Sequence, residues 1–317
     1  MLYSYYIFTG SWGQPGDVSY VKLPYLQTLL IIVIWWVASS VTSITSKEVL
    51  NQGNNLDGQI TTAFVDLRWI DLTAIQLLVG TVISVIYLRI KYNTSIIPDS
   101  SCWRTLIIAV MGHLVGNLAT NASFAAVSSS MTLIIKACEP LFTIICVFCY
   151  TRQPPNVMTV LSVLSICQGA CMFVAADVSF NMSGMWAAVI SNMAFPIRNI
   201  AVKSNLNLTG PLHYYALLSI CGLILLLPVS LIKLVVTQEL PLLEPIESLV
   251  TGLSHGSYNI ASLGVLRKVT PLTHAILNLS KRIFAIILNM LYFSTSCSSL
   301  TYIGLLVFAI GNICFYQ

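Results

Sequence analysis

Hydrophobic residues along this chain occur in long blocks, separated by short breaks that hold turn residues and most of the charged side chains. The blocks lack the strict polar and apolar alternation that is typical of a membrane β-barrel strand. A block of about 20 apolar residues is long enough to cross a bilayer as an α-helix. We therefore expect ten transmembrane helices. They run approximately over Leu26–Ser46, Leu72–Ile90, Leu106–Val127, Met131–Tyr150, Val157–Ala176, Met185–Val202, Leu212–Val235, Leu249–Val265, Leu272–Phe293 and Leu300–Phe315.

Composition supports a membrane location for almost the whole chain. Of its 317 residues, 56% are hydrophobic and 8% are charged, and the mean hydropathy is +0.84. A soluble domain carries about 25% charged residues because its surface must stay hydrated. These values exclude a soluble enzyme. The expected fold class is an all-α polytopic membrane protein, with a short cytosolic tail over residues 1–25 before the first helix.

Basic residues in the breaks between blocks predict the orientation of the helices. If the N-terminus lies inside, the inner breaks hold eight basic residues and the outer breaks hold three. The positive-inside rule then places both termini in the cytosol. The inner set is Lys22, Arg89, Lys91, Arg104, Arg152, Lys203, Arg267 and Lys268, and the outer set is Lys47, Arg68 and Lys233.

The N-terminal tail has neither the basic region of a signal peptide nor the Arg- and Ser-rich composition of a transit peptide. From this we expect an endomembrane compartment, the Golgi or the ER, rather than a plastid envelope. Cys146 and Cys149 form a CxxC pair, but no second ligand pair accompanies it. The sequence therefore predicts no metal site and no cofactor.

Four basic residues lie four or more positions inside the apolar blocks, and a charged residue at a helix centre costs about 2.5–3.5 kcal/mol. Arg198 is close enough to a helix end to snorkel to the interface, and Lys136 could pair with Glu139, which lies three residues later on the same face. Lys281 and Arg282 lie about 15 Å into their helix at 1.5 Å per residue, with no acid nearby in sequence. An excess of positive charge at the bilayer midplane suits an anion that arrives from water.

Two prolines interrupt helices near these charges. Pro140 cannot donate a hydrogen bond to the carbonyl of Lys136, and Pro196 frees the carbonyl of Asn192. A broken helix at membrane depth is tolerated where it lines a cavity or is covered by protein. The coincidence of Pro140 and Lys136 therefore predicts a cavity beside the fourth block.

Three segments carry a family resemblance: TNASFAAVSSSMTLIIKACEP, SNMAFPIRNIAVKS and SYNIASLGVLRKVTPLTHAILNLSKR. They resemble the triose-phosphate translocator family, the sugar-phosphate/phosphate translocators of the drug/metabolite transporter superfamily. The segments cover about a fifth of the chain, and they occur in the family's order. The resemblance implies two inverted five-helix repeats, residues 26–176 and 177–317, around a central cavity.

The resemblance also implies a set of substrate-binding residues. The positions that match the family's phosphate-binding residues are Lys136, Lys281 and Arg282. The positions that match residues near the substrate's carbon skeleton are Thr120, Arg198 and Tyr258, with Phe195 one turn before the arginine.

One family position differs in this chain. Asn117 stands where plastid members have a histidine that helps to hold the non-phosphate end of the substrate, and His113 lies one turn earlier. The phosphate-binding residues are intact, but the identity of the organic phosphate stays open. His274, in the PLTHA segment, has no partner in the sequence pattern and is interpreted as structural.

The predicted function is secondary transport, with a phosphorylated small metabolite exchanged for inorganic phosphate by alternating access. The protein would act in the lipid bilayer as a monomer or homodimer, without a nucleic-acid partner and not as an enzyme. The main alternative is a nucleotide-sugar transporter of the endomembrane system, and Arg282 argues for a terminal phosphate instead. A membrane scaffold leaves the buried cations unexplained. An intramembrane enzyme would need paired acids or a metal set, and Glu139 stands without a second acid.

Overall fold

The computed structural model describes residues 25–52, 67–92, 103–176, 181–237 and 245–294, with short pieces at 302–304, 306–307 and 310–311. The described residues are almost entirely helical and contain no strand. The helices are α2 (Tyr25–Gln52), α3 (Arg68–Tyr92), α4 (Trp103–Ala126), α5 (Ser129–Lys136), α6 (Glu139–Thr151), α7 (Val157–Ala176), α8 (Met182–Thr209), α9 (Pro211–Thr237), α10 (Pro245–Lys268) and α11 (Pro271–Tyr292).

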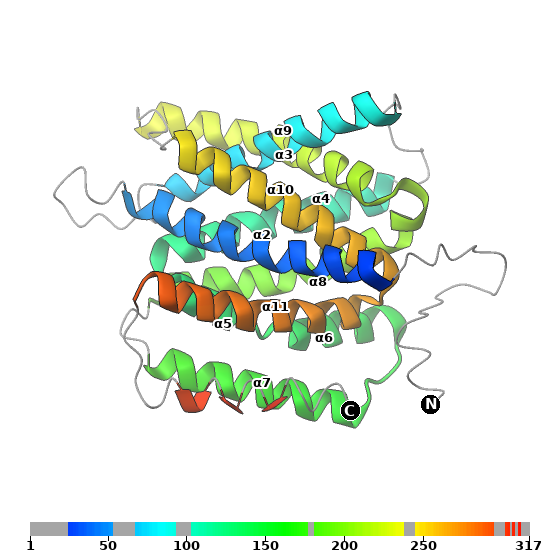
Figure 1. Cartoon of the computed structure of the whole chain (residues 1–317), viewed down its shortest axis with the longest axis vertical. Coiled ribbons are helices and arrows are strands. Elements are labelled where there is room, and N and C mark those ends of the chain that lie inside the picture. The colour runs from blue at the N-terminus through cyan, green and yellow to red at the C-terminus, as the bar shows by residue number, and fades with distance from the viewer. Residues whose placement is uncertain are drawn as a thin grey trace.

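These helices follow the predicted apolar blocks. Six segments of the described chain are long and apolar enough to cross a membrane, with α5 and α6 together counted as one of them. The tenth predicted block is described only in the three short helical pieces, which lie beside α7 (Figure 1). The predicted tail over residues 1–25 lies outside the described residues, except for Tyr25. The described chain is thus an all-helical, multi-pass membrane protein.

The fourth predicted block is two helices, and the break lies where the sequence expects it. α5 begins after Ser128, whose side chain accepts a hydrogen bond from the Met131 amide, and ends at Lys136. α6 begins at Glu139, with Pro140 in its first turn, where a missing N–H costs nothing. Helix α8 continues through Pro196, and the Asn192 side-chain amide donates to the carbonyl of Ile135 in α5 at 2.8 Å.

Close helix pairs build the centre of the bundle, where α4 packs along α8 and α2 packs along α10 (Figure 1). Two glycines on α4 permit the first contact. A Cβ at Gly112 would lie 2.9 Å from the carbonyl oxygen of Ala194, and one at Gly116 would lie 2.9 Å from the ring of Phe195. The Lys268 ammonium donates to Thr28 Oγ1 at 2.8 Å, so α2 and α10 run antiparallel.

One residue of the predicted outer loops lies inside the bundle instead. Lys233 belongs to α9, is buried, and forms an ion pair with Asp71 in the first turn of α3. Lys233 lies within the predicted block Leu212–Val235, so its assignment to an outer break in the charge count was wrong. Its partner comes from a helix 162 residues earlier. The outward faces of the helices are apolar, with Leu29, Ile83 and Leu231 among their exposed side chains, as a lipid environment requires.

Candidate functional site

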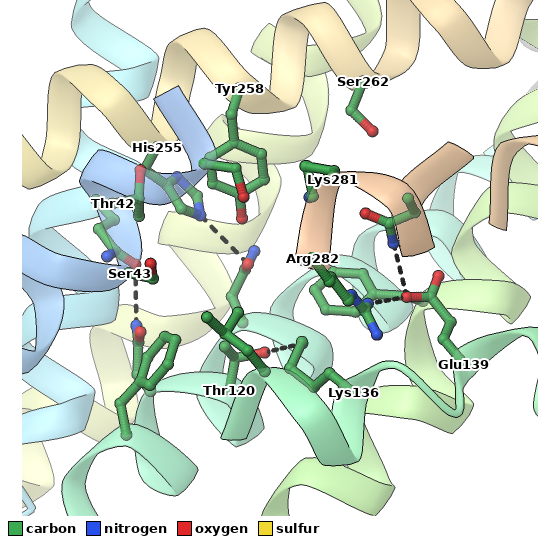
Figure 2. A pocket seen from close by; sticks show the side chains of 18 of the residues that line it. Thr42, Ser43, Thr120, Lys136, Glu139, His255, Tyr258, Ser262, Lys281 and Arg282 are labelled. Carbon is green, nitrogen blue, oxygen red and sulfur yellow. Dashed lines mark hydrogen bonds and ion pairs between the residues drawn. The ribbon is translucent and has the colours of Figure 1, made fainter. Parts of the chain in front are cut away.

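A cavity lies at the centre of the bundle, with side chains from α2, α3, α4, α5, α6, α8, α10 and α11 in its wall. All eight residues to which the sequence points line it, and Figure 2 labels Thr120, Lys136, Tyr258, Lys281 and Arg282 among them. They are Asn117, Thr120, Lys136, Phe195, Arg198, Tyr258, Lys281 and Arg282. Four of them are cationic, and Glu139 is the one carboxylate among the lining residues.

Lys136 is held at the broken end of α5. Its Nζ donates to Thr120 Oγ1 at 2.6 Å and to Ser191 Oγ at 2.5 Å, and it lies 4.5 Å from the ring centroid of Phe195. An ammonium has three N–H donors. Because two of them are used by neutral hydroxyls, one donor and the full positive charge remain for a ligand.

Glu139 pairs with Arg282, not with Lys136. Its Oε2 accepts hydrogen bonds from Arg282 Nη2 and, at 2.8 Å, from Asn278 Nδ2, both on α11 (Figure 2). The helix turns at Ala137 and Cys138, between Lys136 and Glu139, so the two residues do not share one continuous helix face. The suggested local ion pair between Lys136 and Glu139 was therefore wrong.

Arg282 keeps part of its guanidinium for other partners. Its side chain is buried, and Nη1 has no hydrogen-bond partner among the described residues. The guanidinium is a planar fork of five donors that suits a phosphate or carboxylate. Glu139 therefore occupies one side of the fork and leaves the other side unfilled.

Lys281, the neighbour of Arg282, is also buried, with 7% of its surface exposed. Its Nζ lies 5.0 Å from the ring centroid of Trp35 and 5.3 Å from that of Tyr258. Aromatic faces attract a cation without using its N–H donors. Lys281 is therefore held at the cavity by aromatic faces, and its N–H donors have no hydrogen-bond partner in the part of the chain that the structure describes.

Arg198 does not snorkel to an interface. It is buried, and Nε and Nη2 donate to Asn199 Oδ1 at 3.1 and 2.8 Å. Its Nη1 lies 3.2 Å from His113 Nδ1 and 3.4 Å from Asn259 Oδ1, and its guanidinium stands 4.6 Å from the Phe195 ring. Neutral side chains thus fix Arg198 at the wall of the cavity.

The part of the cavity wall away from Lys136, Lys281 and Arg282 is polar, and its lining side chains are neutral except for Arg198, whose Nη1 contacts His113 at its edge. Asn117 lies there, with Nδ2 within 3.3 Å of the ring nitrogens of His113 and Oδ1 3.2 Å from His255 Nε2. Thr42 and Ser43 of α2 lie on the same side of the view as His255, and Lys281, Arg282 and Glu139 lie on the opposite side (Figure 2). The cavity is therefore chemically two-ended.

The family resemblance assigned no role to three further residues of the site, and the structure is what places them there. Ser191 holds Lys136, Asn278 holds Glu139, and His255 lines the neutral end. Their sequence signal was weak, because a serine, an asparagine or a histidine in an apolar helix fits many roles. His274 also lines the cavity and has structural partners. It stacks on Trp35 at 5.0 Å, and its Nε2 lies 2.9 Å from Ser262 Oγ.

A bundle of apolar helices around a buried cationic cavity defines a multi-pass membrane transporter. A family model described as the Triose-phosphate Transporter family matches residues 26–316, and the chain belongs to that family. The family consists of transporters, and the described residues hold no cluster of three or more metal-ligating side chains.

Relatives with several substrates are similar to the chain. It is 28% identical over 307 residues to a triose phosphate/phosphate translocator of Brassica oleracea var. botrytis, with 93% of this chain and 72% of that protein covered. It is 29% identical to a phosphoenolpyruvate/phosphate translocator of Oryza sativa subsp. japonica, with 74% of this chain and 61% of that protein covered. It is 27% identical to a glucose-6-phosphate/phosphate translocator of Arabidopsis thaliana, with 96% of this chain and 80% of that protein covered.

These relatives are chloroplastic proteins by name, so the expectation of a Golgi or ER location has no support among them. The alternative of a nucleotide-sugar transporter is not favoured either.

A chain of a solved crystal structure is similar to this chain in fold, with a TM-score of 0.60 and 12% sequence identity, and 91% of this chain and 94% of that chain are covered. At this level of identity the similarity shows a shared fold.

Proposed function

We propose that the protein exchanges a phosphorylated small metabolite for inorganic phosphate across its membrane. The observation that carries this proposal is the cluster of Lys136, Lys281 and Arg282 in one buried cavity, where Arg282 Nη1 has no hydrogen-bond partner among the described residues. A buried cation without a counter-ion is costly, and a phosphate dianion offers both charge and acceptors. The names of the relatives support phosphate as one of the two exchanged ions.

Each cation has a separate role in this proposal. Arg282 binds two phosphate oxygens through the side of its fork that Glu139 leaves free. Lys281 and Lys136 bind the phosphate as point charges from two different helices. Arg198, Thr120, Tyr258 and Phe195 face the remainder of the substrate, and Asn117 lies at the neutral end.

The same charges explain why transport would be an exchange. Without an anion, Lys136, Lys281 and Arg282 repel one another, and Glu139 neutralises only one of them. The carrier would then reorient only with phosphate or a phosphate ester bound, which gives obligatory antiport.

Alternating access would use two inverted repeats, residues 26–176 and 177–317. Two matching lysine contacts support this arrangement. Lys47, near the end of α2, donates to two carbonyls at the end of α4, and Lys203, on α8, donates to two carbonyls at the end of α10. The contacts are Lys47 to Phe124 and Val127 at 2.7 and 2.9 Å, and Lys203 to Leu266 and Arg267 at 2.8 and 2.9 Å.

These two lysine contacts lie at opposite ends of the bundle. The end of α10 is beside the start of α2, where Lys268 bonds Thr28, and Lys47 lies about 28 Å further along α2 at 1.5 Å per residue. We infer that each lysine holds one end of the transport path closed, with Lys203 on the cytosolic side and both chain termini in the cytosol. The relatives support a plastid envelope as the membrane.

Exchange in proteoliposomes tests the proposal. The purified protein is reconstituted, and uptake of labelled phosphate is measured into liposomes with and without internal phosphate. We expect rapid uptake only into the phosphate-loaded liposomes. Equal uptake into empty liposomes would reject strict exchange, and no uptake into either would reject phosphate transport. Competition by UDP-sugars serves as the control for a nucleotide-sugar transporter and is expected to have no effect.

A further inference from the structure

At the neutral end of the cavity, His255 of α10 has a buried hydrogen-bonding atom without a partner among the described residues. The imidazole is buried, with 2% of the residue exposed, and its Nδ1 has no partner among the described residues. The ring is fixed in place by an edge-to-face contact with Tyr258, whose ring centroid lies 5.1 Å away. A fixed ring with an unfilled buried nitrogen at a cavity wall is suited to contact a ligand.

The contacts of the other ring nitrogen decide which role Nδ1 has. Nε2 lies 3.2 Å from Asn117 Oδ1, an acceptor, and 3.3 Å from Asn259 Nδ2, a donor. The Asn259 amide already donates to the backbone carbonyl of His255 at 3.0 Å. Among the described contacts, His255 is the one that supplies a donor to Asn117 Oδ1. A neutral imidazole carries one proton, so an Nε2–H that donates to Asn117 leaves Nδ1 as an acceptor.

An acceptor at this end selects for a donor on the substrate. The cations that would bind phosphate lie on the opposite side of the cavity from His255 (Figure 2). A phosphate ester held there would extend its carbon chain toward α10, whereas inorganic phosphate has no chain to extend. A hydroxyl on that chain donates a hydrogen bond, and a bare alkyl chain does not.

We propose that His255 is a specificity-determining residue that recognises hydroxyl groups on the carbon chain of the organic phosphate through Nδ1. This inference rests on the proposed phosphate exchange and names the substrate class, hydroxylated phosphate esters. A site with a buried acceptor discriminates against a substrate that leaves the acceptor unpaired.

Two matched compounds and two matched variants test this role. Glycerol 3-phosphate and propyl phosphate have the same three-carbon chain and phosphate, but only the first carries hydroxyls. Each is used as an unlabelled competitor of phosphate/phosphate exchange in proteoliposomes. The variants are His255→Gln, whose amide can reach Asn117 but lacks an acceptor at the Nδ1 position, and His255→Asn, whose amide oxygen can replace Nδ1.

We expect the wild type to bind glycerol 3-phosphate more tightly than propyl phosphate. His255→Gln should reduce this preference, taken as the ratio of the two inhibition constants measured in the same variant, by about tenfold, the value of one hydrogen bond. His255→Asn should restore most of the preference. An unchanged preference in His255→Gln, or a loss of phosphate/phosphate exchange in both variants, would overturn the proposal. Absence of phosphate exchange in the wild type would instead overturn the proposed function itself.

Discussion

Glu139 on α6 forms an ion pair with Arg282 on α11, although 143 positions separate them in the chain. The carboxylate is almost fully buried, and its second oxygen, Oε1, has no partner among the described residues. The pair therefore joins two helices at the cation-rich end of the cavity. It fixes the guanidinium and partly neutralises the site when no anion is present.

Removal of this carboxylate should make the protein depend more on bound phosphate. Glu139→Gln leaves Arg282 without its counter-ion, and loss of one partner of a buried ion pair costs about 3–5 kcal/mol. We expect a lower melting temperature in phosphate-free detergent and a larger stabilisation by added phosphate than in the wild type. Thermal unfolding with and without phosphate measures both. An identical phosphate-induced shift in the two proteins would contradict this role of Glu139.

Removal of the Lys281 charge should abolish exchange without loss of the fold. In Lys281→Gln the cavity keeps a polar side chain of similar length but loses one of the charges that would bind a phosphate dianion. We expect phosphate/phosphate exchange to fall by at least about 100-fold, with normal membrane insertion. Arg89→Gln removes an exposed cation near the end of α3 and serves as the matched control. Retained exchange in Lys281→Gln would exclude Lys281 from the binding site.

The two lysines at opposite ends of the bundle should control access from opposite sides. Lys47→Met and Lys203→Met each remove two hydrogen bonds to helix-end carbonyls. We expect each variant to shift the carrier toward the state that is open at its own end, because charged hydrogen bonds of this kind contribute about 1.5–3 kcal/mol each. Labelling of engineered cysteines in the cavity from each side of the membrane measures the shift. Equal labelling changes on both sides would contradict a side-specific role.

A methyl group at Gly116 should disturb the cavity through Phe195. The added Cβ would lie 2.9 Å from the Phe195 ring, which stands against both Lys136 and Arg198. Overpacking of this kind costs about 1–3 kcal/mol and displaces the ring. We expect Gly116→Ala to lower both the melting temperature and the rate of exchange. Gly264→Ala is the matched control, since its nearest atom, Ile31 Cγ2, lies 3.8 Å away, and its effect should be small.

Some features of the site could be predicted from the sequence because they depend on solvation alone. Lys136, Arg198, Lys281 and Arg282 lie in apolar blocks, and a cation at membrane depth is expected to face the bundle interior whatever its partners are. Pro140 likewise predicts a break near Lys136, because the missing N–H is a local property. The structure confirms that these four cations are buried and that the helix is broken.

Partners could not be predicted in the same way, because they come from helices that are distant in the chain. Proximity in sequence suggested Lys136 as the partner of Glu139, and a position near the end of an apolar block led the charge count to assign Lys233 to an outer break. In the folded chain Glu139 forms an ion pair with Arg282, and Lys233 forms one with Asp71.

The sequence by itself thus determined the membrane class, the helices and the excess of buried positive charge, since each follows from hydropathy along a single segment. Only the tertiary structure decided which donors are filled and which remain for a ligand. Lys136 is held by Thr120 and Ser191, and Nδ1 of His255 has no partner among the residues that the structure describes. The physical reason is that a hydrogen bond requires two groups within about 3 Å, and the packing of α4, α8, α10 and α11 sets those distances.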